Sequence, residues 1–149
     1  MGGGHVGERG TGAMSEHEGR RTEARANRSH ADAVVERAAR ELLELLPRAA
    51  RAVGEFPSFP GAMFACAIEV DPAGELPGDY GCVVLGEDGG LYELVVSHDP
   101  QQEAAGDPVA TRAEELRPLE GMPPEHVVLY AHGAVLVALR HVEHPAAPA

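Results

Sequence analysis

Apolar residues between positions 29 and 53 recur every three or four residues, the spacing of an amphipathic helix. Ser29 followed by Asp32 is a variant of the capping box, which predicts that the helix begins at Ser29. Pro47 is expected to kink or interrupt the helix, because proline lacks the N–H that the helical ladder requires. Gly54 is a residue typical of helix ends. The pattern therefore predicts one long N-terminal helix.

Alternating or continuous apolar segments follow, and they predict three strands. The first is Met63–Val70, in which even and odd positions form two faces. The second and third are Gly81–Leu85 and Leu91–Ser97. Between them, the four residues 87–90 read Glu-Asp-Gly-Gly, a strong signal for a hairpin turn.

The last third of the chain predicts a short helix and a second hairpin. Residues Thr111 to Glu114 form another capping-box pattern, which indicates one or two helical turns. The aliphatic segments Glu125–Ala131 and Ala134–Val142 are then expected to pair, with His132-Gly133 at the tip of the hairpin.

Together these elements predict an α+β fold in the order α-βββ-α(short)-ββ. One long N-terminal helix packs on a five-stranded, mainly antiparallel sheet. Residues 1–28 have almost no large apolar side chain and are expected to form a disordered leader. Residues 29–143 form a single α+β domain, and residues 144–149 a disordered tail. One helix cannot cover both faces of an apolar sheet, so a protein partner or a homodimer is expected there.

The charge distribution excludes several partners. Residues 1–55 carry nine arginines and nine acids, whereas residues 56–149 carry three arginines, fifteen acids and the whole net charge of −12. No lysine occurs in the chain. Phosphate binding needs clustered basic residues, so nucleic acid and anionic membrane surfaces are both disfavoured. The abundance of Ala, Gly, Pro and Arg points to a bacterial, GC-rich genome.

The cysteines and the apolar segments indicate a cytoplasmic protein. Cys66 and Cys82 lie within apolar segments and are expected to be buried, reduced thiols. The first residues lack the apolar stretch of a secretory signal. The longest nearly apolar segment, Val127–Leu139, is too short to span a bilayer.

Two apparent catalytic motifs fail on geometry. The pattern Gly2-x-Gly4-x-x-Gly7 lacks the strand and helix that a dinucleotide fingerprint requires. Ser97, His98 and Asp99 are consecutive, so their side chains cannot converge as those of a catalytic triad do. The sequence therefore predicts no catalytic residues and no cofactor-binding residues.

Histidines provide the remaining chemical signal. Four of them fall at predicted strand ends or just beyond: His98, His126, His141 and His144. In the predicted last hairpin, His126 and His141 lie near each other on one face. Three or four converging imidazoles would suit zinc, although the spacing matches no defined ligand motif.

Two functions from different classes follow. The first is a small, acidic, non-enzymatic binding or chaperone-like module that acts through protein–protein contacts. Its element order resembles the secretion-chaperone type of fold, in which small acidic homodimers carry client proteins, although the predicted order lacks that fold's final helix. The second is a metal-binding protein or metal-dependent enzyme that uses the four histidines. A small-molecule sensor is a further possibility, because Ala65 and Ala67 leave room between helix and sheet.

Overall fold

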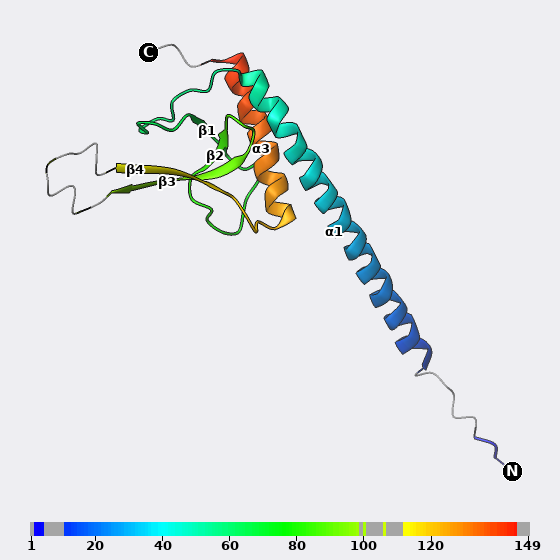
Figure 1. The fold of residues 1–149 in the computed structure, drawn as a ribbon. Coiled ribbons are helices and arrows are strands. Elements are labelled where there is room, and N and C mark those ends of the chain that lie inside the picture. Colours follow the sequence, from blue (N-terminus) through cyan, green and yellow to red (C-terminus); the bar gives the residue numbers. More distant parts are fainter. Residues whose placement is uncertain (1, 5–10, 99, 101–105, 107–111, 146–149) are drawn as a thin grey trace. The chain divides into compact units, whose positions relative to one another are not determined.

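The computed structural model describes residues 2–4, 11–98, 100, 106 and 112–145. The chain forms two compact units, residues 1–35 and residues 36–149. The elements, in chain order, are α1 (Thr11–Val53), β1 (Ala67–Glu69), β2 (Val83–Gly86), β3 (Leu91–His98), β4 (Arg112–Pro118) and α3 (Pro124–Glu143) (Figure 1). The predicted α+β class with a long N-terminal helix is confirmed, but the sheet has four strands rather than five.

Helix α1 begins at Thr11, well before the predicted start at Ser29. Residues 11–28, expected to be disordered, therefore form helix, whereas residues 1 and 5–10 lie outside the described part. The side chains from 14 to 34 are exposed on every face, and weak i,i+4 ion pairs join Arg20 to Glu16 and Arg28 to Asp32. Helix-favouring Ala, Arg and Glu explain this segment. The prediction of disorder considered only that this segment has few apolar side chains to bury.

Pro47 lies inside α1 without interrupting it. The helix continues to Val53, with Leu46 and Ala50 buried in the core. A side chain added at Gly89 would meet the Pro47 backbone, with its Cβ 2.5 Å from the Pro47 Cα and nitrogen atoms. The turn between β2 and β3 therefore packs directly against this point of the helix. Tertiary contact holds the helix here despite the missing N–H.

The four strands form an antiparallel meander in the order β1-β2-β3-β4. The first three strands lie within or beside their predicted segments, and the turn at residues 87–90 is confirmed: the Gly86 N–H donates to the Gly90 carbonyl. Residues 112–118, expected to include a short helix, are instead strand β4, paired along β3.

The predicted last hairpin is wrong, because residues 124–143 form the single helix α3. Pro124 occupies the first turn, where proline costs no hydrogen bond, and Glu125 and Arg140 suit the two ends of the helix dipole. A continuous aliphatic segment fits a buried helix as well as a strand. Among the described residues, neither helix is both long and apolar enough to cross a membrane.

The core lies mainly on one face of the sheet. Figure 1 shows α3 and the C-terminal part of α1 on this side, and Leu46, Leu85 and Ala134 belong to one buried cluster. The opposite face carries a smaller cluster of three buried residues, Ala67, Val84 and Leu94. Among the residues that the structure describes, none of the members of that cluster comes from a helix. This opposite side is called the second face below.

Candidate functional site

The segment between α1 and β1 folds over the second face and contributes Phe59 and Ala65 to its cluster. A turn begins at Phe59, whose carbonyl accepts a hydrogen bond from the Ala62 N–H at 2.9 Å. Pro60 and Gly61 occupy the central positions, and Gly61 has φ +83°, which suits a type II turn. The Phe59 N–H then donates to the Ala65 carbonyl, so both ends of the loop are fixed.

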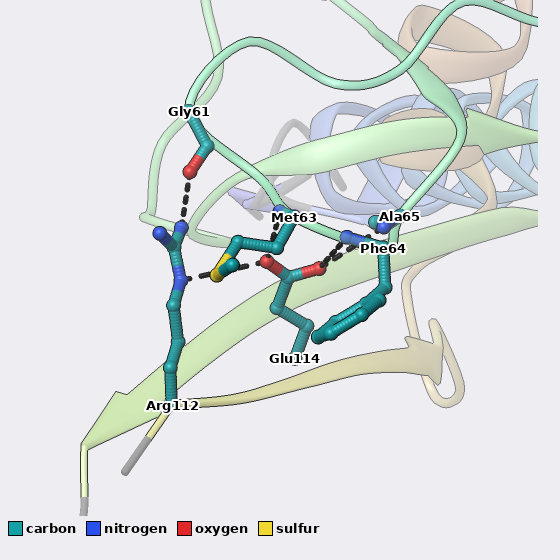
Figure 2. Close-up of polar contacts among 6 residues, drawn as sticks. All are labelled: Gly61, Met63, Phe64, Ala65, Arg112 and Glu114. Carbon is teal, nitrogen blue, oxygen red and sulfur yellow. Dashed lines mark hydrogen bonds and ion pairs between the residues drawn. The ribbon is translucent and has the colours of Figure 1, made fainter. Parts of the chain in front are cut away.

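Three successive backbone N–H groups of this loop converge on one carboxylate (Figure 2). The N–H groups of Met63, Phe64 and Ala65 donate to the Glu114 carboxylate, at 2.5, 2.9 and 3.0 Å. Consecutive N–H groups of this kind form a concave anion site. Strand β4 supplies the anion, and the loop is thereby attached to the far edge of the sheet.

Arg112, two residues before Glu114 on the same side of β4, completes the arrangement. Its guanidinium donates to the Gly61 carbonyl, and its Nε lies 3.4 Å from a Glu114 oxygen. The Glu114 side chain is only 4% exposed, so its charge is satisfied by the loop and by Arg112 rather than by water.

These contacts lower the pKa of Glu114. The hydrogen bond from the Met63 N–H is the largest cause, and those from Phe64 and Ala65 and the Arg112 charge act in the same direction. A depressed pKa in the folded state contributes stability that is present above the unfolded-state pKa and lost as pH falls through the folded-state pKa.

A Glu114→Gln variant is therefore expected to be less stable than the parent at neutral pH, because the neutral amide accepts these hydrogen bonds more weakly. The difference should shrink as pH falls below 4.5, the ordinary value for this carboxyl. Denaturant unfolding at both pH values measures this. Glu115→Gln, at an exposed position of the same strand, is the control and should change stability little. An equal difference at both pH values would contradict the assignment.

The attached loop presents apolar side chains to solvent. Phe64 is 69% exposed and Met63 49%, and Val96, opposite Glu114 in the β3–β4 register, is 40% exposed. A shallow cavity of about 390 Å³ lies beside them and is lined in part by Phe64, Tyr92 and Leu116. Neighbouring exposed apolar side chains of this kind are typical of a protein-binding surface.

The surroundings of Cys82 disfavour a nucleophilic role for that thiol. Cys66 and Cys82 are free and half-buried, rather than fully buried as predicted. Burial, followed by the nearby Glu69 and Glu93 charges, raises the pKa of the Cys82 thiol. A raised pKa keeps that thiol protonated and poorly reactive at neutral pH.

The structure separates the four histidines that were candidate zinc ligands. His98 ends β3, whereas His126 lies in the first turn of α3, with its Nδ1 2.5 Å from the Tyr80 hydroxyl. His141 and His144 lie at the other end of α3. A rise of about 1.5 Å per residue puts about 22 Å of helix between His126 and His141. The predicted hairpin that would have brought His126 and His141 together is instead the helix α3. In the described part of the chain, no group of three His, Cys, Asp or Glu side chains is placed to hold a metal ion.

Sequence reasoning missed the residues that do converge. Glu114 was assigned to a helix cap, and its role depends on a loop about fifty positions earlier in the chain. Phe64 was placed on one face of a long first strand, but β1 begins only at Ala67. No local pattern marks either residue.

Comparison of the chain with protein-family models, with curated proteins and with solved structures finds no match.

Proposed function

We propose that the chain is a non-enzymatic, chaperone-like protein-binding module that associates through the second face of its sheet. The observation that carries the proposal is the loop fixed by Glu114, which holds Met63 and Phe64 exposed beside Val96. A loop already ordered before binding loses little entropy on association, so its apolar contacts contribute more to affinity.

The element order supports the chaperone-like part of the proposal. Helix α3 follows the last strand and occupies the place of the final helix that the predicted order lacked. The order thus shares this final helix with the secretion-chaperone type of fold, although it has four strands rather than five, and β4 where a short helix was predicted. By this resemblance, the first partner we propose is a second copy of the chain, with Phe64 near the centre of the contact.

Sedimentation velocity over a range of concentrations tests the proposal. We expect a reversible dimer that Phe64→Asp weakens by at least about 30-fold, the effect of losing one central anchor residue. Added salt should strengthen the dimer, because each copy carries a net charge of −12 and the contact is apolar.

Leu139→Asp provides the matched control. Leu139 is an exposed apolar residue on α3, away from the loop that carries Phe64, and this substitution should leave the dimer intact. A chain that stays monomeric at every concentration would overturn the proposal. So would a dimer that resists Phe64→Asp but dissociates with Leu139→Asp.

A further inference from the structure

A second groove lies at the opposite edge of the sheet from β4, within the unit formed by residues 36–149. Its volume is about 400 Å³, within the usual range for a ligand site. The outer edge of β1 forms one wall, through Ala67 and Glu69, and the end of α3 forms another, through Val137, Arg140 and His141. Pro57 and Ser58, from the segment before β1, also line it.

Backbone hydrogen-bonding groups of β1 face this groove. β1 is an edge strand, and the Val70 N–H donates to the Val83 carbonyl of β2. Successive residues of a strand direct their N–H and C=O groups to opposite sides, so those of Glu69 point away from β2. On this outer side, the pairing seen among the described residues is one bridge between Ser58 and Cys66, which stops short of Glu69.

The groove also contains a positive charge that forms no ion pair with a described residue. Among the described residues after position 55, Arg112 pairs with Glu114 and Arg117 with Glu115. Arg140, the remaining arginine there, lines the groove and forms no ion pair with any residue that the structure describes. Two acidic residues, Glu69 and Asp71, line the groove on the strand side. The charges therefore fit a ligand with a carboxylate at one end and a basic group close to it.

We infer that this groove binds the C-terminal end of an extended peptide. The peptide adds as a short strand to the edge of β1 and exchanges hydrogen bonds with the backbone of Glu69. Its terminal carboxylate faces Arg140, and a basic side chain just before the terminus faces Glu69 and Asp71. The groove shares Ala67 with the second-face cluster but is otherwise lined by different residues, so this inference goes beyond the proposed dimer and is tested separately.

The probe is a fluorescein-labelled hexapeptide of alternating threonine and valine, with one lysine next to a free C-terminal carboxylate. It is titrated into the full ¹⁵N-labelled chain and followed by anisotropy and by amide spectra. We expect the Glu69 amide signal to shift and its hydrogen exchange to slow. N-methylation of alternate peptide nitrogens, or amidation of the terminus, should each weaken binding at least about tenfold, as the loss of such hydrogen bonds does.

Arg140→Gln should lower the affinity for the peptide with a free carboxylate to that of the amidated peptide. It should not lower the affinity for the amidated peptide any further. Arg117→Gln, an exposed arginine on β4, is the matched control and should leave binding unchanged. Equal affinity for the N-methylated peptide, or no shift of the Glu69 amide at millimolar peptide, would overturn the inference. Phe64→Asp should not affect this binding, so failure of the dimer and failure of the groove are distinguishable.

Discussion

Replacing Gly89 with alanine is expected to unfold the body of the protein at a clearly lower denaturant concentration. Gly89 has φ +85°, a conformation that costs an alanine about 1–2 kcal/mol. The new Cβ would also lie 2.5 Å from backbone atoms of Pro47, which cannot move aside as a flexible side chain can. Overpacking of this kind costs about 1–3 kcal/mol more. The sum is a large fraction of the stability of a small domain.

Gly54→Ala separates the two contributions. Gly54 has a similar φ of +76°, but a Cβ added there would meet nothing within 4 Å. It should therefore incur the conformational cost alone, and the difference between the two variants measures the contact with Pro47. Denaturant unfolding, with a check that the m-value is unchanged, gives both free energies. If both variants lose the same stability, the turn does not pack on α1 as described.

The elements that could be predicted from the sequence are those determined by local signals. The turn at residues 87–90 combines Gly89 and Gly90 with an Asp88 carboxylate that accepts from the Gly90 N–H, so its sequence and its structure agree. The helix from 29 to 53 has a repeating apolar side, which does pack on the core through Leu46 and Ala50. In these places, local preference and tertiary packing favour the same structure.

Strand β4 could not be predicted, because its sequence shows no clear alternation of apolar and polar residues. One side carries Arg112, Glu114 and Leu116, and the other carries Ala113, Glu115 and Arg117, so both sides are largely polar. What decides its conformation is non-local: seven residue pairs with β3, and the loop amides that bind Glu114. The capping-box pattern that predicted a helix here is equally compatible with a strand once those partners are present.

The candidate site was unpredictable for the same reason. The Glu114 carboxylate and the Met63 N–H are 51 positions apart in the chain, and no periodicity connects them. The sequence predicts that one helix leaves part of the sheet open, and the structure places the loop residues Phe59 and Ala65 on the second face. The predicted histidine cluster depended on a hairpin, and the change of that hairpin into α3 moved His126 away from His141 and His144.

The glycine that suggested this hairpin has a different role, which a substitution can reveal. At an ordinary position inside a helix, replacing glycine with alanine stabilises the helix by about 1 kcal/mol. Gly133→Ala should instead destabilise the protein, by about 1–3 kcal/mol, because the added Cβ would overlap the Asp71 carbonyl oxygen. The segment after Asp71 is held close to α3 by a 3.0 Å hydrogen bond from the Ala73 N–H to the Leu129 carbonyl. Gly19→Ala, in an exposed part of α1 with nothing within 4 Å, is the control and should increase helicity in circular dichroism. A stabilising Gly133→Ala would show that α3 and the Asp71 segment are not in this contact.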